Sequence, residues 1–395
     1  METPVFNPLS AEFRSRPYEH YRWFRSHSPV HRVSDAHWLI SRHHDVVAVL
    51  KDYRRFPKDM DTSLAIYPDG WFKLYMQLSM SYMDPPDHTR VRGSVTKAFS
   101  PALIEQMEPS IVRIARELIA QLTTHAGEVD LIADFALQLP IFVMCDLMGI
   151  PVSDRAMFKR CATALIDAIE LSSDAAAHLR ANQAVKQLYD YLGDGVRERR
   201  GRPAKDLLGH LVAAERDGQL SPDEVIHNAI FLLSAGHETT TNLIGNGMHA
   251  LLQHSDQLAT LVAEPGLLDN AVHEFLRFCP PIHFAFRRPA EDIELAGQRI
   301  PARVRLSLAL AGANRDPEVF EDPERLDVRR PNARLHLAFS SGNHTCLGNN
   351  LARLEGRIAF RELLRRFPAP ELAGEPVRRN GLVFQGFTAL PLRVA

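Results

Sequence analysis

The sequence predicts a mainly helical fold with a small strand-rich region, and three observations lead to this class. From about residue 89 to 268, apolar side chains recur at three- and four-residue intervals, which is the period of amphipathic helices. Short strand patterns are concentrated beyond Pro280. No repeat and no Gly- and Ser-rich linker interrupts the chain. We therefore predict one domain over residues 1–395, with a helix-rich core at about 85–280 and a strand-rich region at about 281–395.

Composition limits the classes of partner. Lys and Arg total 46 against 48 for Asp and Glu, so the formal net charge of -2 offers no basic excess for nucleic acid or anionic lipid. The first residues contain no apolar signal-peptide segment, and no later run reaches about 18 apolar residues. We therefore expect a cytoplasmic protein that binds neither nucleic acid nor a membrane.

The first half of the chain has clear local patterns. Residues 37–52 (HWLISRHHDVVAVLKD) predict a short strand followed by an amphipathic helix. Residues 59–83 have weak periodicity and contain Pro68 and Gly70, so we predict a loop with a short helix that lines an apolar pocket. Residues 110–122 and 177–200 have the spacing of ordinary packing helices.

A long helix is predicted after Ser221. Ser221 and Glu224 form a capping box with Pro222 at the first helical position, and the apolar pattern continues to about Leu252. Such a helix is roughly 45 Å long. Its middle contains AGHETT, in which Gly236 and consecutive threonines disfavour regular helix. We therefore predict a distorted turn there that frees backbone carbonyls.

The C-terminal third contains two strand patterns and one charged pair. Residues 291–300 and 302–311 predict short strands, with a turn at Ala296 and Gly297. Before them, Glu274 and Arg277 are three residues apart on one helical turn, so their side chains can form a charge-assisted hydrogen bond.

Four cysteines are widely separated and form no C-x-x-C pair, which argues against a disulfide framework or a zinc ribbon. They are Cys145, Cys161, Cys279 and Cys346. Cys346 differs from the others because it lies in a Gly- and Ser-containing loop directly before a helical pattern that starts near Leu347. The N-terminus of a helix favours an ionised thiolate, which is a good metal ligand.

The residues around Cys346 resemble the signature of the cytochrome P450 superfamily, in particular the bacterial soluble type that hydroxylates macrolides, polyketides and terpenoids. Five positions at fixed offsets carry the resemblance: Phe339, Gly342, His344, Cys346 and Gly348. The resemblance implies a mainly α, triangular-prism-like domain with a small β-rich region. It also implies heme b (iron protoporphyrin IX) as cofactor, with Cys346 as the iron ligand, Phe339 shielding the sulfur and both glycines admitting the flat macrocycle.

The sequence departs from this signature at two positions. Ser340 stands where the family usually has glycine, and Ser341 stands where glycine or another small residue is frequent. The resemblance therefore does not fix the reduction potential of the haem, whereas it still implies Cys346 as the iron ligand.

Further segments resemble the family in the expected order. Ala235, Gly236, Glu238 and Thr239 match its oxygen-activation motif, which implies that Thr239 hydrogen-bonds iron-bound oxygen and Glu238 relays protons. Four residues match contacts to the haem propionates: His88, Arg92, Arg288 and His344, with Arg287 as a neighbouring alternative to Arg288. The family's structural E-x-x-R trio is matched by Glu274, Arg277 and Arg325.

The resemblance implies a monooxygenase that inserts one oxygen atom from O2 into an apolar small molecule, by hydroxylation or epoxidation of a polyketide, terpenoid, steroid or fatty acid. Pocket positions are predicted at Leu233, Ala235, Ile282, His283, Phe284 and Phe384. Electrons would come from NAD(P)H through a separate ferredoxin or flavodoxin and its reductase, docked near Arg90, Arg353 and Arg357.

Three rival functions are distinguishable. A peroxygenase needs no proton relay, so Glu238 and Thr239 argue against it. A haem-based sensor shares the cysteine ligand but turns over no substrate. A zinc hydrolase built on His344 and Cys346 needs two more ligands at suitable spacing, and the sequence shows none.

Overall fold

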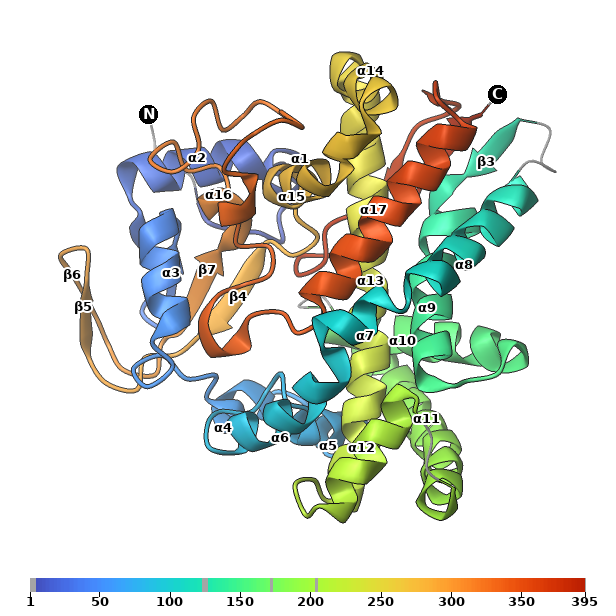
Figure 1. The fold of residues 1–395 in the computed structure, drawn as a ribbon. Coiled ribbons are helices and arrows are strands. Elements are labelled where there is room, and N and C mark those ends of the chain that lie inside the picture. Colours follow the sequence, from blue (N-terminus) through green and yellow to red (C-terminus); the bar gives the residue numbers. More distant parts are fainter. Residues whose placement is uncertain (1–4, 123–126, 171–172, 203–204, 395) are drawn as a thin grey trace. The chain divides into compact units, whose positions relative to one another are not determined.

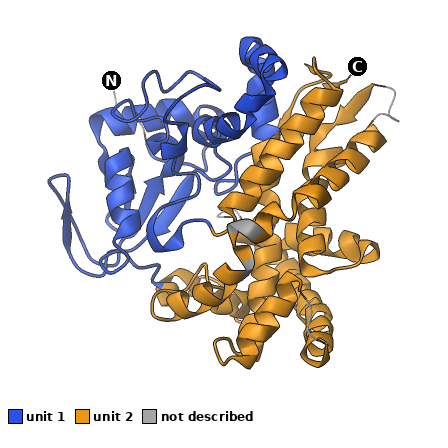
Figure 2. Ribbon diagram, in the orientation of Figure 1, with its two compact units in different colours: residues 1–59, 245–346, 378–387 blue, residues 60–244, 347–377, 388–395 orange. Residues whose placement is uncertain are grey.

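The computed structural model describes residues 5–122, 127–170, 173–202 and 205–394, and Figure 1 labels its elements. The chain forms two compact units from interleaved segments, which Figure 2 distinguishes by colour. Unit 1 comprises residues 1–59, 245–346 and 378–387, and unit 2 comprises residues 60–244, 347–377 and 388–395.

Unit 1 contains a mixed four-stranded sheet with the order β1-β2-β7-β4. The strands are β1 (Val30–Ser34), β2 (His37–Ile40), β4 (Phe284–Arg287) and β7 (Arg305–Ala309). Strands β2 and β7 are parallel, and the other two pairs are antiparallel. Apolar side chains of the sheet, including Ile40 and Leu308, share one core cluster with Val46 and Val49 of α3 (His43–Lys51). The predicted strand-then-helix segment is therefore confirmed.

The predicted hairpin of unit 1 is also present. Strands β5 (Ile293–Leu295) and β6 (Gln298–Ile300) pair antiparallel. The two turn residues have positive φ, 49° at Ala296 and 76° at Gly297, which suits a tight hairpin turn. The helices of this unit are α1 (Ala11–Ser15), α2 (Pro17–His27), α3, α14 (Ser255–Ala263), α15 (Leu268–Phe278) and α16 (Leu310–Ala313), with 3-10 turns η4 (Pro265–Leu267), η5 (Ala333–Leu335) and η6 (Gly342–His344).

Unit 2 is mostly helical. Its α-helices are α4 (Met60–Leu64), α5 (Trp71–Leu78), α6 (Asp87–Thr96), α7 (Pro101–Glu105), α8 (Glu108–Leu122), α9 (Gln138–Met148), α10 (Arg155–Ile169), α11 (Ala175–Gly201), α12 (Leu207–Arg216) and α17 (Asn349–Arg366). Shorter elements are the 3-10 turns η1 (Lys97–Phe99) and η3 (Val152–Asp154) and the π-helix η2 (Ile132–Ala136). A small sheet has the order β3-β11-β8, from β3 (Glu128–Asp130), β11 (Pro391–Arg393) and β8 (Glu371–Leu372). Strands β9 (Val377–Arg378) and β10 (Phe387–Ala389), each of which contains residues of both units, form a further pair.

Residues 60–78 are more helical than the sequence suggested. Both α4 and α5 are formed, and Phe72, Tyr75 and Met76 of α5 are buried. The Tyr75 hydroxyl lies 3.1 Å from the Ser234 hydroxyl of the long helix. Packing against that helix therefore stabilises a segment whose own periodicity is weak.

The predicted long helix is α13 (Pro222–Gln253), with 32 residues. Its capping box is formed: the Ser221 N–H donates to Glu224 at 2.8 Å, and the Glu224 N–H donates to the Ser221 hydroxyl at 3.2 Å. Arg90 of α6 donates to both oxygens of Glu224, at 2.9 and 2.7 Å. This charge-assisted contact lowers the pKa of Glu224 and fixes α6 to the start of α13.

In the part of the chain that the structure describes, no helix combines the length and the apolar character that crossing a membrane requires.

Candidate functional site

The thiolate loop, defined as residues 338–348, ends just before α17. The Cys346 N–H donates to the carbonyl oxygen of Phe339 at 2.8 Å, which closes the loop. Every residue from 338 to 350 is half-buried, including the cysteine, in contrast to the buried residues at 336 and 337. The helix starts at Asn349, two residues later than predicted, with Gly348 as its N-cap.

Backbone geometry explains two residues of this loop. Gly342 has φ 71°, and a Cβ built there would lie 2.5 Å from the carbonyl oxygen of Leu50 in α3, so only glycine fits. Ser340 has φ 59°, a left-handed conformation that glycine adopts more easily. Ser340 therefore replaces the glycine of the family signature at a position where the backbone conformation itself favours glycine.

Two of the other cysteines are ordinary buried thiols. Cys145 is fully buried and Cys161 is 4% exposed. Burial raises the pKa of Cys145 to about 12 and also raises that of Cys161, which keeps both protonated. Cys346, half-buried at the end of a loop, differs from both in its access.

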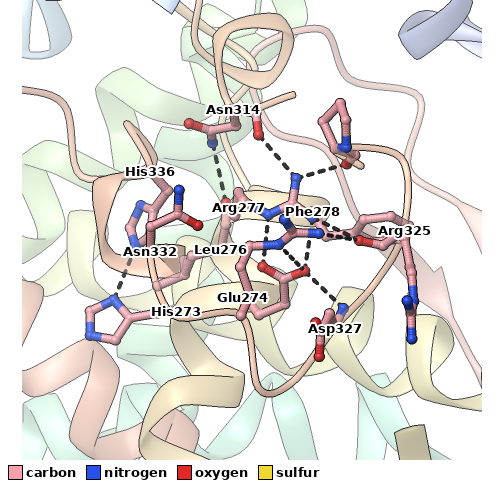
Figure 3. A network of polar contacts seen from close by, with 12 residues as sticks. His273, Glu274, Leu276, Arg277, Phe278, Asn314, Arg325, Asp327, Asn332 and His336 are labelled. Atoms are coloured by element: carbon pink, nitrogen blue, oxygen red, sulfur yellow. Dashed lines mark hydrogen bonds and ion pairs between the residues drawn. The ribbon is translucent and has the colours of Figure 1, made fainter. Parts of the chain in front are cut away.

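The E-x-x-R pair lies in the core of unit 1 (Figure 3). Arg277 donates two bonds to Glu274, at 2.7 and 2.8 Å, and both side chains are fully buried. Arg277 also donates to the carbonyl oxygens of Asn314, Pro323 and Arg325. Through these bonds, α15 fixes the segments that precede the thiolate loop.

The third side chain of this network is that of Arg330. The prediction that the Arg325 side chain completes the E-x-x-R trio was wrong. Arg325 contributes only its backbone carbonyl, whereas its side chain belongs to an exposed residue. Arg330 is 5% exposed and donates to Glu274 at 3.2 Å. Sequence spacing could not identify this residue. The fold of the loop decides which arginine points inward to Glu274, and an irregular loop has no periodic pattern that reveals it.

Arg287 and Arg288 have different surroundings. Arg288 donates to the carbonyl oxygen of Arg303 at 2.8 Å and lies 3.9 Å from Asp59, so its guanidinium is used within unit 1. Arg287 is only 3% exposed. Arg287, the last residue of β4, is therefore the more deeply buried of the two cations, and the choice of Arg288 as a propionate contact stays a prediction.

Helix α13 is buried along most of its length, with one exposed stripe. From 225 to 244, only Phe231, Ala235, Gly236 and Thr239 are half-buried, and all other residues are buried. Phe231, Ala235 and Thr239 are four residues apart and therefore share one face. The accessible face of α13 thus includes Ala235 and Thr239 of the predicted motif. Phe231 belongs to the same face, and its four-residue spacing from Ala235 could have indicated this.

The predicted distortion does not interrupt α13, which is one continuous helix. The Thr239 hydroxyl donates to the carbonyl oxygen of Ala235 at 3.2 Å, within the helix. Gly236 has a packing explanation, because a Cβ there would lie 3.2 Å from the sulfur of Met144. The Glu238 carboxylate, 3% exposed, accepts a bond from Asn242 at 3.2 Å.

Thr241 connects α13 to a neighbouring element through its hydroxyl. The Thr241 hydroxyl donates to the carbonyl oxygens of His237 and of Ala136 in the π-helix η2, at 3.1 and 3.0 Å. A single π turn often leaves a carbonyl available to a side chain. This contact therefore joins η2 to α13 close to Glu238 and Thr239.

His88 and Arg92 lie on one face of α6, as predicted from their spacing. His88 is 2% exposed, whereas Arg92 is half-buried. His344, in η6, is also half-buried. Each of these three residues takes part in polar or ring contacts.

The predicted pocket residues divide into two groups. Leu233, His283 and Phe284 belong to the core: Leu233 is fully buried, and the Tyr21 hydroxyl lies 3.0 Å from His283. Burial lowers the pKa of His283 to about 3, so its ring is neutral. Phe284 packs edge-on against Phe6. These three predictions of pocket lining are therefore not supported.

Ile282 and Phe384 meet in a β-bridge of unit 1, although 102 residues separate them in the chain. The Asn246 amide of α13 donates to the carbonyl oxygens of Cys279 and Gln385, at 3.2 and 3.0 Å. The bridge therefore fixes the C-terminal loop beside the strand that follows the E-x-x-R helix.

The donor chemistry of the thiolate loop fits a haem iron. Cys346 supplies one soft ligand, and the described residues contain no group of three or more His, Cys, Asp or Glu side chains placed to hold a metal ion. A Cβ at Gly348 would meet no protein atom within 4 Å, which leaves room for a flat group. One thiolate would suit an iron whose remaining protein-independent ligands come from a macrocycle, whereas a zinc site needs three or four protein ligands.

Comparison with known proteins gives one consistent result. The family model for cytochrome P450 matches residues 9–380. "Cytochrome P450 monooxygenase PikC" of Streptomyces venezuelae is 40% identical over 398 residues, covering 98% of this chain and 92% of that protein. "Vitamin D(3) 25-hydroxylase" of Pseudonocardia autotrophica is 38% identical, covering 97% and 95%.

A third relative is similar in both sequence and structure. "Polyketide biosynthesis cytochrome P450 PksS" of Bacillus subtilis is 35% identical over 412 residues, covering all of both chains. Its solved structure superimposes with a TM-score of 0.90, covering 99% of this chain and 100% of that one.

Proposed function

Since the chain belongs to the cytochrome P450 family of haem monooxygenases, we propose that it inserts one oxygen atom from O2 into an apolar small molecule of the polyketide class. The observation that carries the proposal is the half-buried Cys346 at the end of a closed loop directly before α17. The class of substrate is supported by the similarity to PksS, which is named for its part in polyketide biosynthesis.

Cys346 is the proposed ligand of the haem iron. When bound, haem supplies the activation of O2, and electron donation from the thiolate favours O–O cleavage. The bond from the Cys346 N–H to Phe339 holds the sulfur at a fixed position. Gly342 holds the loop close to α3, and Phe339 restricts access of water to the sulfur.

Glu238 and Thr239 are the proposed proton-handling residues. Thr239 lies on the accessible stripe of α13 and can exchange its bond to Ala235 for one to an oxygen ligand. Glu238 is buried and accepts from Asn242, so its carboxylate oxygen can take up or release a proton beside Thr239. Replacing Thr239 by alanine should leave O2 consumption largely intact and lower the product formed per O2.

The propionate carboxylates are proposed to meet His88 and Arg92 from α6, His344 from the thiolate loop, and Arg287 in place of Arg288. Arg287→Ala should weaken haem retention, whereas Arg288→Ala, whose guanidinium bonds to Arg303, should retain it. Haem loss to an acceptor protein measures both variants. Equal retention in the two variants would restore Arg288 as the candidate.

The substrate proposal is tested by ligand binding and turnover together. A polyketide lactone should shift the iron from low to high spin, and turnover with a surrogate redox partner should give a product heavier by one oxygen atom. A steroid, a terpenoid and a fatty acid serve as the comparison panel. A preference for any of these over the lactone would contradict the polyketide assignment. Neither NADPH consumption nor product with any compound would favour a sensor.

Electrons are proposed to arrive from NAD(P)H through a separate ferredoxin or flavodoxin with its reductase. Four arginines, Arg116, Arg357, Arg361 and Arg365, surround only two carboxylates, Glu108 and Glu362, on α8 and α17. The excess of positive charge suits an acidic donor. Arg353 lies on α17 one turn before Arg357. Arg90 is paired with Asp87 and Glu224 and is therefore left out of this surface.

The docking proposal is tested by the salt dependence of reduction. The double variant Arg353→Gln/Arg357→Gln should slow association with an acidic ferredoxin and flatten its dependence on ionic strength. Arg32→Gln, which removes an exposed arginine paired with Asp35, is the matched control and should change neither. Unchanged rates in the double variant would remove this surface from the proposal.

A further inference from the structure

His273 of α15 and His336, which follows η5, form a buried pair in unit 1 (Figure 3). The distance from His273 Nδ1 to His336 Nε2 is 3.2 Å, and each residue is only 7% exposed. Their ring centroids are 5.4 Å apart. The two imidazole rings are therefore joined by a hydrogen bond that is shielded from water.

The direction of this bond follows from a second contact. The Ala338 N–H donates to His336 Nδ1 at 3.2 Å. Because a backbone N–H cannot accept, His336 Nδ1 carries no hydrogen, and in the neutral ring the hydrogen is on Nε2. His336 Nε2 then donates to His273 Nδ1, which must also be unprotonated. Both neutral rings thus carry their hydrogen on Nε2.

The pair is connected to the thiolate loop by short contacts. The His336 ring lies 5.4 Å from the ring of Phe339, whose carbonyl oxygen accepts the Cys346 N–H at 2.8 Å. Between them, the Leu337 N–H donates to the Asn314 side chain at 2.6 Å. The segment that leads into the thiolate loop is therefore held both by Asn314 and by the histidine pair.

A proton on either ring would disrupt this arrangement. On His336 it would place an Nδ1–H against the Ala338 N–H, and on His273 it would place an Nδ1–H against the hydrogen of His336 Nε2. Two donors that face each other in a buried site cost the full free energy of the lost hydrogen bond.

The charged groups on the elements around the pair do not offset this cost. On α15, Glu274 is bound by Arg277 and Arg330, and Asp269 is bound by Arg334 at 2.8 Å. In the segment that leads to η5, the Asp327 side chain accepts the Arg329 N–H. Among the described residues of these elements, the carboxylates are thus already engaged by arginine or backbone donors.

We propose that His273 and His336 are positioning residues for the Cys346 thiolate. The neutral pair fixes Phe339, and with it the carbonyl oxygen that holds the Cys346 N–H; protonation of either ring releases the loop and weakens thiolate ligation. This inference rests on the proposed role of Cys346 as haem ligand. Neither ring contacts the reacting atoms. The histidine pair acts only by holding the thiolate loop in place, and acid removes this effect.

The test follows the ferrous carbon monoxide complex of the holoenzyme, whose red-shifted Soret band reports thiolate ligation, as the pH is lowered from about 7.5 to 5. The wild type should lose this band within that range. In His273→Gln, the amide oxygen can accept from His336 but cannot be protonated in this range, so the midpoint should fall by about half a pH unit or more.

His273→Phe keeps a ring but removes the acceptor. The His336 N–H is then left buried without that partner, so thiolate ligation should be lost about tenfold faster at pH near 7.5. His37→Gln is the matched control, because burial lowers the pKa of His37 to about 4 and its ring bonds to Ser307, away from the thiolate loop. Its midpoint should equal that of the wild type.

Nitrogen NMR of labelled histidines in the diamagnetic carbon monoxide complex reads the tautomers directly. Both rings should carry hydrogen on Nε2 at pH near 7.5. A hydrogen on His336 Nδ1, equal midpoints in the wild type and His273→Gln, or equal behaviour of the Gln and Phe variants would each overturn the inference. A wild type that lacks the red-shifted band at every pH would instead overturn the proposed ligand.

Discussion

At the scale of single residues, backbone conformation and burial decide what the thiolate loop and α17 tolerate. Ser340 has φ 59°, whereas its neighbour Ser341 is extended at φ -151°. Two serines that look equivalent in the sequence therefore have opposite conformational preferences. Nothing in the local pattern distinguishes them, because φ is set by how the loop closes on Phe339.

Ser340→Gly should stabilise the protein by about 0.5 to 1 kcal/mol, because glycine adopts the left-handed conformation without strain. Ser341→Gly should destabilise it by a similar amount, because glycine only adds entropy to the unfolded chain there. Thermal unfolding of both variants checks the pair. A loss of stability in Ser340→Gly would show that the hydroxyl contributes more than the backbone strain costs.

Glu355 of α17 is a second residue whose behaviour depends on its surroundings. It is 1% exposed, and desolvation raises the pKa of its carboxyl group to about 8. The folded state therefore binds a proton that the unfolded state releases above about 4.5. Folding stability must fall as the pH rises from about 4.5 to 8, because the folded state resists ionisation.

Glu355→Gln removes this titration. The variant should be more stable than the wild type at pH 8 by about 2 to 3 kcal/mol, and the difference should vanish toward pH 4.5. Glu362→Gln, on the same helix, should be destabilising instead, because arginines around Glu362 keep its pKa low despite burial. A pH-independent difference between the wild type and Glu355→Gln would contradict the assigned ionisation.

At the scale of elements, the sequence predicted what depends on period and spacing. The capping box before α13, the strand and helix at residues 37–52, and the Glu274–Arg277 pair on α15 were all predicted correctly. Residues 59–83, predicted as a loop with one short helix, contain both α4 and α5, because burial of Phe72 and Tyr75 stabilises α5 beyond what its own pattern indicates.

Contacts made by loops could not be predicted in the same way. The choice between Arg325 and Arg330 depends on how the segment before the thiolate loop folds around Glu274. The choice between Arg287 and Arg288 depends on the register of β4, since one residue of shift exchanges the two faces of a strand. Spacing along the chain contains neither fact.

Arg330→Ala tests this network at its corrected member. Removing the guanidinium takes one cation away from the fully buried Glu274 and removes a donor from backbone carbonyl oxygens. The free energy of unfolding should therefore fall by about 3 kcal/mol. Arg325→Ala should change stability by no more than about 0.5 kcal/mol, because only its backbone takes part. Denaturant unfolding of the two variants decides between them, and the reverse ranking would reinstate Arg325.

At the scale of the whole molecule, the fold class and the family could be predicted because motifs in the right order span nearly the whole chain. The family model covers residues 9–380, and the relatives cover nearly all of it. The single domain over 1–395 stays a prediction, since the segments of the two units alternate along the chain. Substrate identity was not predictable, because apolar positions such as Leu233 and Phe284 have the same sequence pattern whether they line a pocket or pack in the core, and both are buried.

The central claim is that Cys346 is the thiolate ligand of the haem iron. The most direct test is the ferrous carbon monoxide difference spectrum of the reconstituted wild type and of Cys346→Ala, with Cys161→Ala as the control for a buried thiol. The red-shifted Soret band of thiolate ligation should appear in the wild type and in Cys161→Ala, and it should be lost in Cys346→Ala. A wild type without that band, or a Cys346→Ala variant that keeps it, would show that Cys346 is not the ligand.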